Sequence, residues 1–134
     1  MELREYFENA SGVGVLSTAD HEGTVDSAIY ARPHVMDDGS LVLIMRDRLS
    51  HHNLQSNPKA AYLFLEHGPG YRGKRFFLKK ISEEQDAERI KELRRRCYAE
   101  EDDLNREATF LVYFRIEKEL PLIGSGIQAE RPGT

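Results

Sequence analysis

The sequence predicts a mainly β (α+β) protein built as a six-stranded antiparallel β-barrel with helices on its periphery. Six segments have the length and apolar pattern of β-strands, and short turns join several of them. Helical patterns occur at only a few points between these strands. The chain has 134 residues, which is a single-domain length. We therefore expect one domain over residues 1–134, with a C-terminal tail from about residue 118.

The first half of the chain places one short helix before its strands. Residues 2–9 predict that helix, and strands are expected over residues 12–18 and 24–35. Pro33 has no N–H to give to a ladder, so the second strand should end near it or lie at a sheet edge. Residues 41–45 are apolar throughout, which indicates a strand that is buried on both faces.

A short helix and two strands occupy the middle of the chain. The helix is expected over residues 50–56, and it ends at Asn57 because a residue before proline avoids helical backbone. The two strands are expected over residues 59–66 and 75–81.

The clearest helix is expected over residues 82–98. Ser82 and Gln85 have the spacing of a capping box, which marks a helix start. One stripe of this helix carries Ala87, Ile90, Leu93, the stem of Arg94, Cys97 and Tyr98. A cysteine on such a stripe is expected to pack rather than to act as a nucleophile.

The last predicted strand, residues 108–117, is apolar on both faces. One face carries Phe110, Val112, Phe114 and Ile116, and the opposite face includes Leu111 and Tyr113. A strand of this kind needs a second cover. On a chain this small we expect that cover to be a subunit interface.

Composition and charge exclude several classes of protein. The 19 Lys and Arg residues against 23 Asp and Glu give a net charge of -4, which disfavours nucleic-acid binding. No apolar run approaches the ~20 residues of a membrane-spanning helix, and the N-terminus lacks a signal-peptide pattern. The single cysteine excludes an internal disulfide. We expect a cytoplasmic protein with no nucleic-acid or membrane partner and, since the histidines lack metal-ligand spacing, no metal site.

The most informative segment for function is residues 44–54, where a buried strand emerges into two arginines and a helix begins at Ser50. A helix N-terminus offers free N–H groups and the positive end of the helix dipole. Arg46 and Arg48 add donors that match phosphate oxygens. The alternative is a surface helix flanked by solvated arginines.

Two other segments are candidate binding regions. Residues 27–32 end a strand across which a flat ring could lie, although this could be an ordinary core strand. The glycine-rich loop 68–73 precedes basic residues that could hold an anionic group or simply be solvated, namely Lys74, Arg75, Lys79 and Lys80.

Taken together, these segments resemble the FMN-binding split-barrel family related to pyridoxamine 5'-phosphate oxidase. The resemblance spans roughly residues 3–117 and lies in the order of the elements. Its most specific part is the pattern x-S-x-x-N-L-x-x-N-P at Leu49–Pro58 followed by a strand, and the G-P-G-Y loop at 68–71 adds to it.

The resemblance implies a homodimeric split barrel with FMN at the subunit interface. It implies that Arg46, Arg48, Ser50 and Asn53 hold the phosphate and that residues 29–32 contact the flavin ring. Family members often carry Lys near position 50, where this chain has Ser50. The full set of implied cofactor-binding residues is Ile29, Tyr30, Ala31, Arg32, Met45, Arg46, Arg48, Leu49, Ser50 and Asn53.

The function that the resemblance implies is an FMN-dependent oxidoreductase that acts on a small-molecule substrate or electron donor. A flavin needs no catalytic acid, base or nucleophile from the protein, and the sequence carries no such constellation. Two alternatives remain open. One is a non-catalytic flavin carrier or sensor, and the other is a relative that binds deazaflavin or haem in the same barrel. The chain ends without the Arg-containing, substrate-binding segment of true pyridoxamine phosphate oxidases, so that substrate is not expected.

Overall fold

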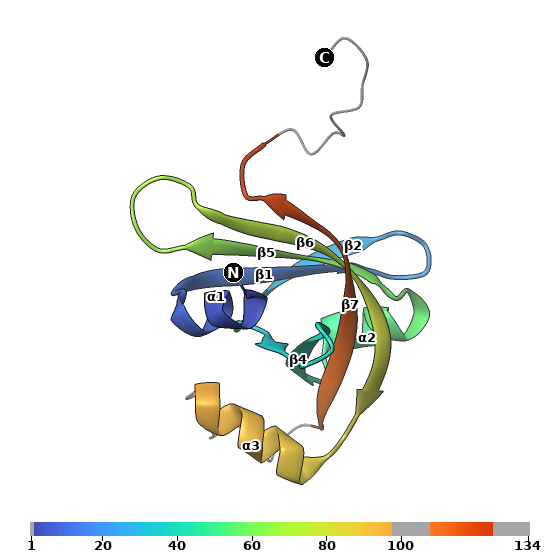
Figure 1. Cartoon of the computed structure of the whole chain (residues 1–134). Coiled ribbons are helices and arrows are strands. Elements are labelled where there is room, and N and C mark those ends of the chain that lie inside the picture. The colour runs from blue at the N-terminus through green and yellow to red at the C-terminus, as the bar shows by residue number, and fades with distance from the viewer. Residues whose placement is uncertain (1, 98–107, 125–134) are drawn as a thin grey trace.

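The computed structural model describes residues 2–97 and 108–124, which form one antiparallel sheet of seven strands with three helices (Figure 1). The strand order in the sheet is β2-β1-β5-β6-β7-β4-β3. The elements are α1 (Leu3–Asn9), β1 (Gly12–Ala19), β2 (Val25–Tyr30), β3 (His34–Val35), β4 (Leu41–Arg46), α2 (Leu49–Ser56), β5 (Lys59–Glu66), β6 (Gly73–Glu84), α3 (Ala87–Cys97) and β7 (Thr109–Pro121).

The sheet is curled because its two edge strands are neighbours in the chain. Strands β2 and β3 lie at opposite ends of the strand order, yet only residues 31–33 join them. Each residue spans at most ~3.6 Å, so this link forces the two edges of the sheet close together. The result is a half-barrel with a split between β2 on one side and β3 and β4 on the other (Figure 1).

The predicted strand over residues 24–35 is therefore two strands, and the predicted count of six is wrong. Strand β2 pairs with β1, whereas β3 pairs with β4 at the other end of the sheet. Pro33 lies in the link between them, where its missing N–H costs no ladder hydrogen bond. The sequence located this interruption, but the two separate pairings depend on the curl of the whole sheet.

The main core fills the concave side of the sheet. Strand β4 is buried on both faces, as its apolar run predicts, and β7 shows the predicted alternation. Phe7 from α1 packs edge-on against Phe64 with ring centroids 5.5 Å apart, so α1 covers one end of this core. The buried residues of the core are Phe7, Leu16, Leu41, Leu43, Met45, Leu54, Tyr62, Phe64, Phe76, Leu78, Val112 and Phe114.

Helix α3 covers the outer face of β4 and β7, where the sequence analysis expected a subunit interface. Its residues Ile90 and Leu93 pack with Val42 and Leu111 in a second apolar cluster, with Tyr113 against it. Leu111 is completely buried within this chain. The chain therefore supplies a second cover for this face of β7 itself, and a subunit interface at β7 stays a prediction.

Helix α3 begins later than predicted, and β6 is correspondingly longer. Strand β6 continues to pair with β7 through Glu84, and Ser82 pairs with Tyr113 in that ladder, so the predicted capping box does not form. Asp86 starts the helix instead, since its Oδ1 accepts hydrogen bonds of 3.1 Å from the backbone N–H groups of Glu88 and Arg89.

Strand β7 is longer than predicted, and part of the predicted stripe of α3 lies outside the described residues. Strand β7 runs to Pro121, so residues 118–121 belong to the sheet and not to a tail, and the remaining tail residues 125–134 lie outside the described part. Of the predicted α3 stripe, Tyr98 and the side chains of Arg94 and Cys97 also lie outside it. No helix in the described ranges is long and apolar enough to cross a membrane.

Candidate functional site

A pocket with a volume of about 670 Å³ lies in the split of the barrel. Edge strand β2 forms one wall, β3 and β4 form the other, and the first turn of α2 closes one end. The lining residues are Asp26, Ala28, Ile29, Tyr30, Ala31, Arg32, His34, Leu43, Ile44, Arg46, Arg48, Leu49 and Ser50. Eight of the ten predicted site residues therefore meet in one pocket.

Strand β2 presents both side chains and backbone to this pocket. Its residues alternate, with Asp26, Ala28 and Tyr30 half-buried and the intervening side chains exposed. It pairs with β1 on one side and has no strand partner on the other within the described part of the chain. The N–H and C=O groups of that open edge can bond the polar edge of a flat ligand.

The first turn of α2 offers a binding place for an anion. Arg48 is the N-cap residue, and no side chain caps the helix in the part described. The first N–H groups of a helix have no partners within the helix and point outward. Arg46, Arg48 and Ser50 line the pocket, and all three lie in or next to the first turn of the helix.

Tyr30 joins the β2 wall of the pocket to the first turn of α2 and keeps its proton. Burial raises the pKa of its phenol, while a hydrogen bond with the side chain of Ser50 and the nearby charge of Arg48 partly offset that rise. Ser50 is only 3% exposed, so this contact is shielded from water. A protonated phenol and a serine hydroxyl group can both donate to an anionic oxygen at this end of the pocket.

Arg32 lines the pocket and also donates hydrogen bonds to the end of α1. Its Nη1 donates to the carbonyl oxygens of Phe7 and Ala10 at 3.0 and 2.5 Å. These carbonyls belong to the C-terminal end of α1, where a helix leaves its acceptors without intrahelical partners. Arg32 thus fixes α1 against the link between β2 and β3.

Two of the predicted residues do not reach the pocket. Met45 is fully buried in the main core. The side-chain amide of Asn53 donates to Thr18 Oγ1 at 3.0 Å, and both side chains are buried. Asn53 therefore attaches α2 to β1 instead of lining the pocket.

The sequence analysis missed five lining residues, which are Asp26, Ala28, His34, Leu43 and Ile44. The signal for two of them was present, because Asp26 and Ala28 share a strand face with Tyr30 at a spacing of two residues. Ile44 begins the segment 44–54 that the sequence analysis singled out. His34 and Leu43 depend on the pairing of β3 with β4 and on the curl of the sheet, which no local pattern indicates.

The basic residues near the glycine-rich loop do not line this pocket. Lys74 pairs with Glu119 at 2.7 Å, and Lys80 pairs with Glu83 at 2.8 Å. Arg75 Nε donates to the carbonyl oxygen of Pro121 at 2.9 Å. These contacts within the chain favour the interpretation that this basic segment supports the sheet.

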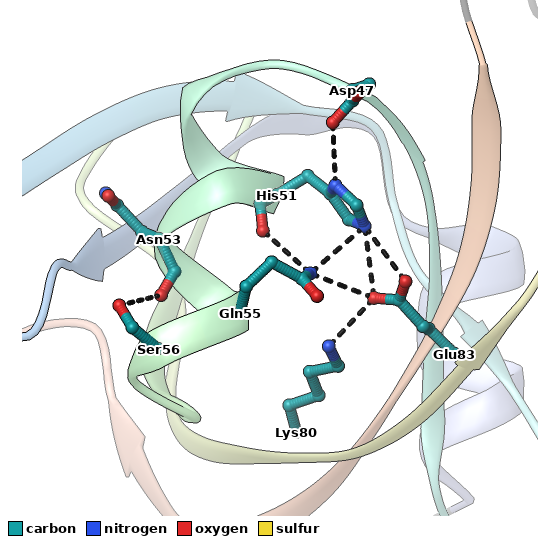
Figure 2. Close-up of polar contacts among 7 residues, drawn as sticks. All are labelled: Asp47, His51, Asn53, Gln55, Ser56, Lys80 and Glu83. Atoms are coloured by element: carbon teal, nitrogen blue, oxygen red, sulfur yellow. Dashed lines mark hydrogen bonds and ion pairs between the residues drawn. The ribbon is translucent and has the colours of Figure 1, made fainter.

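A polar cluster lies behind the first turn of α2 and is centred on His51 (Figure 2). His51 Nδ1 lies 3.0 Å from Asp47 Oδ1, and Nε2 lies 3.0 Å from Glu83 Oε1. Gln55 and Lys80 complete the cluster by donating to Glu83 Oε1 at 3.1 and 2.8 Å. No group of three or more His, Cys, Asp and Glu side chains in the residues described could hold a metal ion.

Burial and hydrogen bonding act in opposite directions on Glu83. Burial alone would raise its pKa, but hydrogen bonds from Lys80, Gln55 and His51 outweigh burial and lower the pKa to about 2. Glu83 is therefore an ionised acceptor over the physiological pH range, and it links β6 to α2.

Comparison with solved structures shows the same fold in proteins of low sequence identity. An FMN-binding protein from Syntrophomonas wolfei is 19% identical, with a TM-score of 0.73 over 91% of this chain and 84% of that one. An F420 reductase is 16% identical, with a TM-score of 0.70 over 90% of this chain and 98% of that one. A pyridoxamine 5'-phosphate oxidase-like protein from Lactobacillus delbrueckii is also 16% identical, with a TM-score of 0.65 over 90% and 92%.

No family model matches the sequence, and no curated protein matches it either. The structural matches nevertheless cover nine-tenths of the chain. They confirm at the level of the fold the resemblance that the order of elements predicts. The chain has the split-barrel fold of FMN-binding and pyridoxamine 5'-phosphate oxidase-like proteins.

Proposed function

We propose that this protein binds FMN in the split of the barrel and acts as an FMN-dependent oxidoreductase on a small molecule. The observation that carries the proposal is the convergence of Arg46, Arg48 and Ser50 on the N-terminal turn of α2, at one end of a pocket that is walled by the open edge of β2. The pocket volume of about 670 Å³ falls in the ~300–1,000 Å³ range of small-molecule sites.

The two ends of the pocket suit the two ends of FMN. The phosphate would lie at the start of α2, held by helix N–H groups, the two arginines and the hydroxyl groups of Ser50 and Tyr30. The ring would lie along β2, with backbone groups of residues 29–32 at its polar edge. FMN would supply the electron transfer, and the protein would position it and exclude water.

The same proposal includes a homodimer, with a second copy on the outer face of β1, β2 and β5. Val15 lies opposite both Ile29 and Leu63 in the ladders, so the three side chains form one apolar patch. Ile29 is 70% exposed and Leu63 is 37% exposed. Ile29 also lines the pocket, so a copy that covered the patch would help to enclose a ligand.

Replacing both Arg48 and Ser50 by alanine tests the placement of the phosphate. We expect the double variant to bind FMN at least tenfold more weakly, because charge-assisted hydrogen bonds contribute about 1.5–3 kcal/mol each. Fluorescence titration with FMN and with riboflavin, which lacks the phosphate, measures the effect. Riboflavin affinity should change little. An equal loss for both ligands, or no loss for FMN, would contradict this placement.

Two measurements separate the proposed enzyme from its alternatives. The absorption spectrum of the purified protein distinguishes FMN from deazaflavin and haem, and the shared fold with an F420 reductase is the reason to test deazaflavin. Anaerobic addition of NADH or NADPH then tests for turnover. Rapid bleaching of the flavin supports an oxidoreductase, whereas no reaction with either nucleotide favours a flavin carrier or sensor.

A further inference from the structure

We propose that Asp26 is a specificity-determining residue of the pocket, and that its carboxylate shifts the preference of the pocket away from phosphate monoesters and toward phosphodiesters. A monoester carries up to two negative charges, whereas a diester carries one. The inference rests on the proposed function for the place of the phosphate group at the start of α2. Asp26 lines the same pocket as the residues that would hold this phosphate, Arg46, Arg48 and Ser50.

Asp26 lies on the face of β2 that turns toward α2. Thr18 of β1 stands directly opposite it in the ladder, and such a pair points to the same side of the sheet. The side chain of Thr18 is bound to α2, since its Oγ1 accepts a hydrogen bond of 3.0 Å from Asn53. The Asp26 carboxylate therefore projects from the strand beside α2, and the half-buried position of the residue agrees with this direction.

The same face of β2 leads from Asp26 to the start of α2. Tyr30 follows Asp26 by four residues, and side chains at an even spacing on a strand share a face. The hydroxyl group of Tyr30 meets Ser50 in the first turn of α2. Burial is the main cause of the raised pKa of Tyr30, while the charge of Asp26 adds to this rise and the charge of Arg48 opposes it. Both charges thus act at one hydroxyl group of the pocket.

The repulsion between Asp26 and a ligand depends on the charge of the ligand. Coulomb energy is proportional to the product of the two charges, so Asp26 opposes a doubly charged phosphate twice as strongly as a singly charged one. A phosphate monoester is mostly doubly charged above its second pKa of about 6. A diester lacks that second proton, and a neutral ligand is not opposed at all. A carboxylate that only supported the fold would instead change the binding of all three kinds of ligand alike.

The first experiment needs no flavin. Inorganic phosphate, mostly doubly charged at about pH 8, and dimethyl phosphate, singly charged, are titrated at low salt while NMR follows the backbone N–H of Ser50. Asp26→Asn removes the charge and keeps the size of the side chain. It should bind inorganic phosphate about fourfold more tightly, which is the factor for charges of one and two units roughly 10 Å apart in water, and dimethyl phosphate about twofold more tightly.

Asp26→Glu keeps the charge and should therefore bind both anions as the wild type does. Equal gains for the two anions in Asp26→Asn, or no gain, would overturn the inference. A Ser50 signal that neither anion moves would overturn it as well, because no anion would then bind at the start of α2.

The second experiment repeats the comparison with three forms of one ring. The ligands are FMN, the singly charged cyclic phosphodiester of riboflavin, and riboflavin itself, each titrated by fluorescence at about pH 8. Asp26→Asn should gain about fourfold for FMN, about twofold for the diester and nothing for riboflavin. These gains should shrink in about 1 M salt, where charges are screened within about 3 Å.

Glu22→Gln is the matched control for the flavin titrations. It removes the same charge from the turn between β1 and β2, where the Glu22 side chain is 74% exposed and does not line the pocket. All three affinities should stay close to those of the wild type. Equal gains for all three ligands in Asp26→Asn would show a structural role for Asp26 and overturn the inference.

The two experiments separate the inference from the proposed function. If the simple anions show the expected ratio and no flavin binds to either variant, the role of Asp26 stands and the proposed function fails. If FMN binds and Asp26→Asn changes its affinity no more than that of riboflavin, the FMN site stands and the role of Asp26 is wrong.

Discussion

The outer face of the curled sheet is covered over one half and bare over the other. On β4 and β7, the side chains of Val42 and Leu111 are completely buried beneath α3. On β1, β2 and β5, Ile29 and Leu63 point outward and are 70% and 37% exposed. Both halves are apolar, and they differ only in whether the described part of this chain supplies a cover. An apolar outer face in the sequence therefore predicts that a cover exists, but not which molecule provides it.

The largest effect we expect comes from the covered half. Leu111→Ala removes a fully buried side chain from between the sheet and α3, so the free energy of unfolding should fall by about 2–5 kcal/mol. Urea denaturation at low protein concentration measures this change. The matched control is Leu63→Ala on the bare half, where the loss should stay below about 1 kcal/mol. Equal losses at the two positions would mean that the halves do not differ as described.

The next largest effect we expect is on self-association through the uncovered outer face of β1, β2 and β5. Ile29→Asp places a charge in the exposed apolar patch, so self-association should weaken at least tenfold because an unpaired charge would be buried between copies. Sedimentation velocity measures it, and circular dichroism should show an unchanged fold. Tyr71→Asp serves as a control, since Tyr71 is equally exposed but lies in the loop between β5 and β6. A wild-type protein that is monomeric at all concentrations would remove the basis for a partner on this face.

The contrast between the halves also explains which parts of the fold the sequence could predict. The strands around residues 12–18, 41–45 and 59–66 follow from local apolar patterns, and the end of the short helix α2 follows from Asn57 before Pro58. The structure confirms these elements. The start of α3 does not, because the local capping signal of Ser82 competes with its long-range pairing to Tyr113. The cover over Leu111 is also a long-range contact, because it comes from Ile90 and Leu93 of α3.

The candidate site shows the same division between local and long-range information. The segment from Arg46 to Ser50 forms a strand end followed by a helix start, which the residue types indicate directly. Asn53 has an equally suitable side chain, but its amide bonds Thr18 on β1, a contact between residues distant in the sequence. His51 has a local partner in Asp47, but its partner Glu83 comes from β6, which no local pattern indicates. Sequence reasoning could locate the pocket, but only the packing shows which polar side chains face it.

The smallest effect we expect comes from removing one hydroxyl group, that of Tyr113, on the covered half of the sheet. Tyr113 lies beneath α3 and its hydroxyl group donates to Glu84 Oε2 at 2.5 Å, in a contact that is exposed to solvent. Tyr113→Phe keeps the ring against the apolar cluster and removes only that bond, so unfolding should become easier by about 0.5–1.5 kcal/mol, with no change in self-association. Tyr113→Asp would place a carboxylate beside Glu84 and against the apolar cluster, and should destabilise the folded chain. If sedimentation instead showed that Tyr113→Phe weakens self-association while stability is retained, the interface would reach β7 and the division between the halves would have to be redrawn.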